Sequence, residues 1–179
     1  EKHPRISDKE RALLAENVAA QGDDVITVPW KQLLSAPAVW ALIVNHFCSN
    51  WGLYMLLAWL PSYFKKAQGL SIEHAGLFSA APWLIMFIMI NVAGWIADGM
   101  TRRGTTLTVV RKTMQTIGLG GSAIFLLLAS GADSVVASVL LMCGALGALG
   151  FTWSGYGPNH LDVAPRHAGV LMGITNTAG

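Results

Sequence analysis

Charged side chains are scarce in this sequence. Asp, Glu, Lys and Arg make up 12% of its 179 residues, whereas hydrophobic residues make up 53%, and the mean hydropathy is +0.48. This composition is typical of a protein that lies in a lipid bilayer, and it argues against a soluble domain. The net charge of +2 does not indicate a nucleic-acid partner, because the basic residues lie between apolar runs and form no basic face with aromatic residues.

Cysteine and the usual residues of an active site are also few. The two cysteines, Cys48 and Cys143, lie inside apolar runs and have no spaced partner, so they indicate neither a disulfide framework nor a metal site. His160 and Asp162 are close in sequence but lack a third ligand, and we interpret Asp162 as a helix cap. We therefore expect no catalytic residue, no metal, no cofactor and no enzyme activity.

Long uncharged stretches, by contrast, are abundant. Membrane spans are predicted over about 39–64, 74–98, 112–132 and 133–159, with an incomplete one over 166–179. A helix rises about 1.5 Å per residue, so each of the first four can cross about 30 Å of hydrocarbon. The sequence thus predicts an all-α membrane bundle with four and a half spans. Because it lacks a starting Met and ends within an apolar stretch, we expect it to be part of a longer chain.

The polar stretch 1–37 is predicted to be a cytoplasmic loop, and residues 38–179 a partial transmembrane bundle. A short surface helix is expected from about residue 8 to residue 20, because Ser7 and Glu10 have the S-x-x-E spacing of a reciprocal helix cap. Further caps are expected at Ser71 and Asp133. Ser35 and Pro37 suit the first turn of the first span.

Basic residues are distributed unequally between the two sides of the predicted bundle. Of the twelve Lys and Arg residues, only Lys65 and Lys66 lie on the side opposite residue 1, because successive spans reverse direction. Loops rich in Lys and Arg remain in the cytoplasm, so the side of residue 1 is predicted to be cytoplasmic. We expect a multi-pass protein of a bacterial inner membrane, with a plastid or other organelle membrane as the alternative.

Polar residues form a stripe on the first predicted span. Asn45, His46, Ser49 and Asn50 fall within a sector of about 140° at 100° per residue. Such a stripe must face protein or a water-filled cavity. One interpretation is hydrogen bonding between helices, and the other is the lining of a substrate path. His46 is a candidate for proton coupling, because its charge can change near neutral pH.

The fourth predicted span has a similar polar side and several glycines. Thr152, Tyr156 and Asn159 fall on one side of this helix. The substrate-path candidates are Asn45, His46, Ser49, Asn50, Tyr54, Thr152, Tyr156 and Asn159. The glycines are expected to let neighbouring helices approach closely, and they are Gly144, Gly147, Gly150, Gly155 and Gly157. Core packing alone is an alternative explanation for each polar residue.

The loop after the second span combines an acidic residue with arginines and glycines. Gly94, Asp98, Arg102, Arg103 and Gly104 lie there. An acidic side chain at a helix end can bind a neighbouring helix N-terminus and nearby arginines, which would form a latch that breaks when two bundles separate. Asp162 and Arg166 are further latch candidates. The alternative is ordinary positive charge on the cytoplasmic side.

This loop resembles the cytoplasmic motif of the major facilitator superfamily, whose members have twelve spans. The match is G-x-x-x-D followed by basic residues and Gly, although Gly99 stands where a basic residue usually follows the Asp. Residues 45–51, 60–63, 110–112 and 159–176 resemble the anion:cation symporter branch. That branch includes sialin, vesicular glutamate transporters, plant plastid anion transporters and bacterial relatives.

The resemblance extends from about Trp30 to the end of the sequence. It implies that the spans correspond to the seventh through tenth and part of the eleventh. The substrate-binding arginines of the family lie mainly in the first half, and the glutamate carriers have an arginine where Ser49 stands here. The implied function is a monomeric secondary transporter that moves a small anion by alternating access, coupled to H⁺ or Na⁺. The alternative is a scaffold or receptor that uses the transporter fold without transport.

Overall fold

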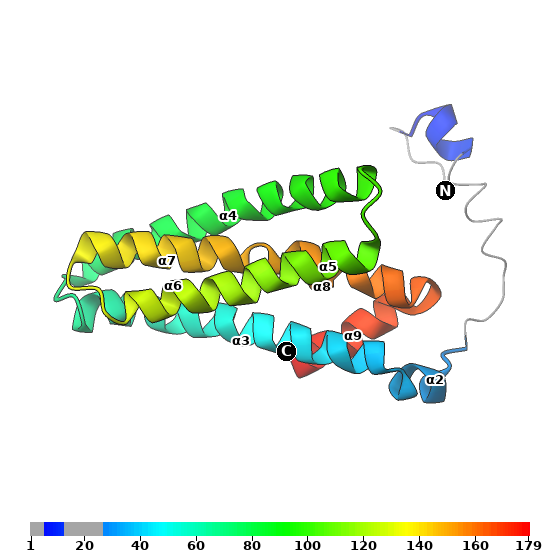
Figure 1. The fold of residues 1–179 in the computed structure, drawn as a ribbon, viewed down its shortest axis with the longest axis horizontal. Helices are drawn as coiled ribbons and strands as arrows, with labels where there is room; N and C mark the ends of the chain where they lie inside the picture. The colour runs from blue at the N-terminus through cyan, green and yellow to red at the C-terminus, as the bar shows by residue number, and fades with distance from the viewer. Residues whose placement is uncertain (1–5, 13–26) are drawn as a thin grey trace. The chain divides into compact units, whose positions relative to one another are not determined.

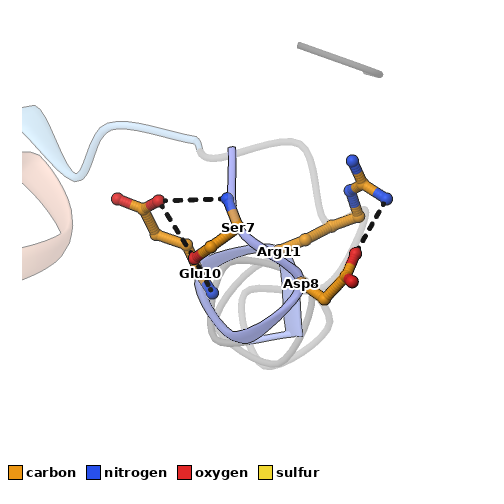
Figure 2. A network of polar contacts seen from close by, with 4 residues as sticks. All are labelled: Ser7, Asp8, Glu10 and Arg11. Carbon is orange, nitrogen blue, oxygen red and sulfur yellow. Dashed lines mark hydrogen bonds and ion pairs between the residues drawn. The ribbon is translucent and has the colours of Figure 1, made fainter. Parts of the chain in front are cut away.

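The computed structural model describes residues 6–12 and 27–179, which fall into two units, 1–31 and 32–179. In the first unit, residues 8–12 are helical. Figure 2 shows the cap of this helix: the Glu10 N–H donates to Ser7 Oγ at 3.2 Å, and the Ser7 N–H donates to Glu10 Oε2 at 3.4 Å. The expected reciprocal cap is therefore confirmed. The predicted continuation over 13–20 lies outside the described residues.

The helices of the second unit follow one another with short connections. Helix α2 (Trp30–Ser35) spans the boundary between the two units. After it come α3 (Pro37–Lys66), α4 (Ile72–Arg102), α5 (Leu107–Gln115), the π-helical turn η1 (Thr116–Gly120), α6 (Gly121–Ala129), α7 (Val135–Leu149), α8 (Thr152–Val163), the 3₁₀ turn η2 (Pro165–His167) and α9 (Ala168–Ala178). The long helices of this unit run side by side, with α7 between α4 and α6 and with α9 beside α3 (Figure 1). The described residues form no β-strand.

Three of these helices have the length and apolar composition of a membrane span. They are α4, the continuous helix Leu107–Ala129 and the continuous helix Val135–Val163. Helix α3 has 30 residues, but the polar stripe from Asn45 to Asn50 makes it less apolar. Large apolar side chains cover the outside of the unit, for example Trp95 and Leu127, whose exposed fractions are 72% and 73%. An apolar exterior of this extent fits a lipid environment. The all-α fold class is confirmed.

Two of the expected helix caps differ from the structure. Ser71 does cap α4, because its Oγ accepts the His74 N–H at 3.3 Å. Asp133 does not cap α7; the cap is Ser134, which has the extended backbone of an N-cap and accepts the Ala137 N–H at 3.2 Å. Ser35 does not cap α3 either, since its hydroxyl donates to Gln32 O within α2. Pro37 occupies the first turn of α3, as expected.

Close helix packing explains four of the five glycines singled out in the sequence. Gly144 lies against Phe125, Gly147 against Ile85, Gly150 against Ile90 and Gly155 against Gln115. At Gly155 a Cβ atom would lie 3.1 Å from Gln115 N and 3.3 Å from Arg111 O, so only glycine lets the backbones of α5 and α8 approach so closely. Gly157 is the exception, because a Cβ atom added there would have nothing within 4 Å.

Candidate functional site: a buried histidine junction

The polar stripe of α3 faces neighbouring helices of its own bundle. His46, Ser49 and Asn50 are buried, Asn45 is half-buried, and Tyr54 is exposed. Two members of the stripe make hydrogen bonds to other helices, which accords with the first of the two interpretations of this stripe. That the eight candidate residues line a substrate path stays a prediction.

His46 meets two residues that the sequence analysis did not select. Its Nδ1 atom lies 2.9 Å from the hydroxyl oxygen of Thr175 on α9, and Nε2 of His160 on α8 lies 2.8 Å from the same oxygen. Nδ1 of His160 lies 2.9 Å from the carbonyl oxygen of Gly157. The exposed fractions of His46, His160 and Thr175 are 4%, 2% and 0%. A single hydroxyl group thus connects two buried imidazoles and three helices.

Tyr156 completes this cluster from the α8 side. Its ring centroid lies 4.7 Å from that of His46, and the centroids of His46 and His160 are 6.0 Å apart. We call His46, Tyr156, His160 and Thr175 the histidine junction. Tyr156 was predicted as a site residue and does lie beside His46. Thr152 does not join them, because its hydroxyl donates to Leu149 O at 2.7 Å in the preceding turn. Asn159 is half-buried.

A second polar contact ties the same stripe to α5. The Gln115 amide nitrogen donates to Ser49 Oγ at 3.2 Å. The amide oxygen of Gln115 is buried and has no hydrogen-bond partner among the described residues. Ser49 therefore holds α3 to α5 one turn away from the contact that His46 makes with α9.

An ion pair joins α5 to α8 near the end of the bundle. Arg111 Nε donates to Asp162 Oδ2 at 2.8 Å, and its Nη1 donates to the carbonyl oxygen of Ser154 at 3.1 Å. The side chains of Arg111 and Asp162 are 16% and 23% exposed. The interpretation of Asp162 as the cap of the next helix is therefore wrong: it lies within α8, and its carboxylate is used by Arg111.

The other latch candidates are not brought together. Asp98, Arg102 and Arg103 are exposed at the end of α4, and the described residues give none of them, nor Arg166, an ion-pair partner. Gly104 has φ of +86°, which glycine tolerates, and it forms the turn into α5. Gly94 has open space where a side chain would lie. A latch role for these residues stays a prediction.

A hollow elsewhere in the bundle is apolar. A cavity of about 400 Å³ lies between α4, α6 and α7, and it is lined by Ile85, Met89, Phe125, Ala148, Phe151 and their neighbours. Such a lining offers nothing to pair with an anion. Within 6–12 and 27–179 there is also no group of three or more His, Cys, Asp or Glu residues that could hold a metal ion.

Apolar helices that enclose a buried polar network define the class of multi-pass helical membrane proteins. The family model described as Major Facilitator Superfamily matches residues 2–179. The chain therefore belongs to the major facilitator superfamily, which confirms the resemblance that its loop motif indicated. Membership of this family also confirms that the chain is not an enzyme.

Individual relatives agree with the anion:cation symporter branch. The chain is 46% identical over 176 residues to "Sodium-dependent phosphate transport protein 1, chloroplastic" of Arabidopsis thaliana, which covers 98% of the chain and 34% of the relative. It is 42% identical over 176 residues to the "Ascorbate transporter, chloroplastic" of the same plant, covering 98% and 32%. It is 36% identical over 184 residues to human "Vesicular glutamate transporter 2", covering 99% and 32%. The chain thus spans about a third of the length of these relatives.

Sequence reasoning missed four residues of these networks. His160 was considered only as half of a metal pair, and Thr175, Arg111 and Gln115 were not considered as site residues. A signal for Thr175 was available, because it is a polar residue within an apolar run, as is His46. The contacts of Arg111 and Gln115 depend on how α5 packs against α3 and α8, and no spacing in the sequence determines that packing.

Proposed function

We propose that the protein containing this chain is a secondary active transporter that moves a small organic or inorganic anion by alternating access, coupled to H⁺ or Na⁺. Family membership supports a transporter, because transporters of this kind rock two bundles around a site near the middle of the membrane. The chain would supply most of one bundle. The family resemblance places the arginines that attract the anion mainly in the other bundle.

The observation that carries this proposal is the histidine junction itself. Two imidazoles and a threonine hydroxyl are buried among apolar helices, where polar groups are costly unless they are hydrogen-bonded. Ionisable residues within membrane helices commonly mark ion or proton pathways. Since histidine changes charge near neutral pH, the junction favours H⁺ over Na⁺ as the coupling ion.

The printed names of the relatives support an anionic substrate. Phosphate, ascorbate and glutamate are chemically unlike one another, but each carries negative charge at neutral pH. We propose an anion of this size range as the substrate, with Asn45, Asn50, Tyr54 and Asn159 contributing to its path.

Conformational change and membrane location are further parts of the proposal. Residue 1 would lie on the cytoplasmic side, and the protein would act as a monomer. Asp98 with Arg102 and Arg103 would form the latch when the two bundles close on that side. Several relatives are named as chloroplastic, which supports a plastid membrane. This location is the alternative to the bacterial inner membrane that the sequence analysis expects.

Reconstitution of the full-length protein in liposomes tests this proposal. Uptake of labelled phosphate, ascorbate and glutamate would be measured with an imposed pH gradient, with an imposed Na⁺ gradient, and with neither. We expect at least one anion to accumulate above its equilibrium level when a gradient is present. Protein-free liposomes are the control. Absence of uptake of all three anions under every gradient would contradict the proposal and favour a scaffold that does not transport.

A further inference from the structure

The hydrogen positions in the histidine junction follow from elementary donor and acceptor rules. The Gly157 carbonyl oxygen can only accept, so the Nδ1 atom of His160 must carry a hydrogen. In a neutral imidazole the other nitrogen then has a lone pair and accepts. The Thr175 hydroxyl has two acceptors within reach, Nε2 of His160 at 2.8 Å and the Met172 carbonyl oxygen at 3.1 Å. Only the hydroxyl can supply the hydrogen that a neutral Nε2 accepts, so beside a neutral His160 it donates to Nε2 rather than to Met172. Because this hydrogen is now used, the Thr175 oxygen can only accept from His46, so Nδ1 of His46 must donate over 2.9 Å.

The two bonds to Thr175 can also be satisfied with their directions reversed. If His160 holds one excess proton, so that Nε2 as well as Nδ1 carries a hydrogen, Nε2 donates to the Thr175 oxygen, and the hydroxyl can then donate to Nδ1 of a neutral His46. The two arrangements use the same atoms at the same distances. They differ in which imidazole holds the hydrogen on the nitrogen that faces Thr175.

We infer that His46, Thr175 and His160 form a proton relay in which the Thr175 hydroxyl passes one excess proton between the two imidazoles. When His46 is doubly protonated, it gives its Nδ1 hydrogen to the Thr175 oxygen. At the same time the original hydroxyl hydrogen moves to Nε2 of His160. One N–H and one O–H bond break, one O–H and one N–H bond form, and the positive charge moves from His46 to His160. This inference rests on the proposed function, which supplies the proton and the gradient.

The surroundings of the relay allow one positive charge rather than two. Two buried charges with ring centroids 6.0 Å apart would repel each other strongly in a medium of low dielectric constant. The ionisable group that packs directly against His46 from α8 is Tyr156, and α9 contributes the uncharged Thr175. The nearby charges on α5 and α8, Arg111 and Asp162, are paired with each other. A proton that enters at His46 can thus be stored at His160, bonded to the backbone of α8.

Two substitutions at Thr175 distinguish an effect of losing the hydroxyl from an effect of changed packing. Thr175→Val removes the hydroxyl and keeps the shape of the side chain, whereas Thr175→Ser keeps the hydroxyl and removes a methyl group. In full-length protein in liposomes, we compare uptake driven by a pH gradient with exchange of the same anion without a gradient, using phosphate, ascorbate and glutamate. For Val we expect the ratio of driven uptake to exchange to fall at least tenfold. For Ser we expect a change of less than twofold. The relay would be overturned if Thr175→Val kept the wild-type ratio of driven uptake to exchange, or if Thr175→Val and Thr175→Ser lowered this ratio equally.

A spectroscopic measurement tests the relay without relying on transport. Nitrogen-15 NMR of histidine-labelled full-length protein in detergent reports which ring nitrogens carry hydrogen. In the wild type we expect His160 to carry it on Nδ1 and His46 and His160 to titrate as a coupled pair that first takes up one proton. A neutral His160 with hydrogen on Nε2, or two independent titrations, would overturn the relay even if transport is found. If the wild type carries none of the three anions but shows the coupled titration, the proposed function fails and the shared proton site stands.

Discussion

Two regions of the bundle differ in the polar side chains that they bury. Where α3, α8 and α9 meet, the histidine junction buries His46, His160 and Thr175 in mutual contact. Where α4, α6 and α7 meet, most core residues are apolar, among them Met86, Leu146 and Leu149, and the buried polar side chains of these three helices are serines without ionisable groups. In lipid, association of α4, α6 and α7 depends on close packing, because the surrounding lipid is as apolar as the side chains. We infer that the packing of α4, α6 and α7 maintains the fold, whereas the histidine junction carries out proton transfer.

The largest effect on stability is expected in the apolar region. Leu146→Ala removes a side chain that is 0% exposed and leaves a cavity, so we expect a loss of about 2–5 kcal/mol in unfolding free energy. Leu140→Ala, on the same helix, is the control, because Leu140 is 65% exposed. Thermal unfolding in detergent measures both variants. Equal losses of unfolding free energy in Leu146→Ala and Leu140→Ala would show that burial between α4, α6 and α7 does not stabilise the protein more than an exposed position does.

The ion pair between α5 and α8 is expected to have the next largest effect. Asp162→Asn replaces the charged acceptor of Arg111 by a neutral one, and we expect a loss of about 2 kcal/mol because hydrogen bonds to charged groups are the stronger ones. Asp98→Asn is the matched control, because Asp98 has no ion-pair partner in the part of the chain that the structure describes. The same unfolding assay applies. If Asp98→Asn lowered the unfolding free energy as much as Asp162→Asn, the ion pair with Arg111 would not be the cause of the loss.

A smaller effect is expected where α5 and α8 touch. In Gly155→Ala the new methyl group would lie 3.1 Å from Gln115 N, and overpacking of this kind costs about 1–3 kcal/mol. Gly157→Ala, half a turn away on the same helix, has nothing within 4 Å and should be neutral or stabilising. The difference in melting temperature between the two variants is the measurement. A stable Gly155→Ala protein would mean that α5 and α8 need not lie so close.

The smallest effect is expected at the start of α7. Ser134→Ala removes the hydroxyl that accepts the Ala137 N–H, and loss of such a cap costs about 1 kcal/mol. Asp133→Ala is the control and should cost less, because Asp133 is not the cap. If the melting temperature falls more for the Asp133 variant, the assignment of the cap is wrong.

Helix positions followed from the sequence far better than the contacts of the site did. Uncharged runs and capping spacings predicted where helices lie, because length and hydrophobic character are local properties, although the cap of α7 was placed one residue too early. The histidine junction depends on side chains 129 residues apart along the chain, His46 and Thr175. Helical periodicity could show that His46 lies on a polar stripe, but it could not show which helix that stripe meets.

Transport measurements on two variants test the central comparison most directly. His160→Gln alters the histidine junction, whereas Leu146→Val trims one methylene group from the apolar region. In full-length protein in liposomes, the ratio of pH-gradient-driven uptake to gradient-free exchange should fall at least tenfold for His160→Gln and stay unchanged for Leu146→Val. If His160→Gln keeps the wild-type ratio, or if both variants lower it equally, coupling does not reside where α3, α8 and α9 meet.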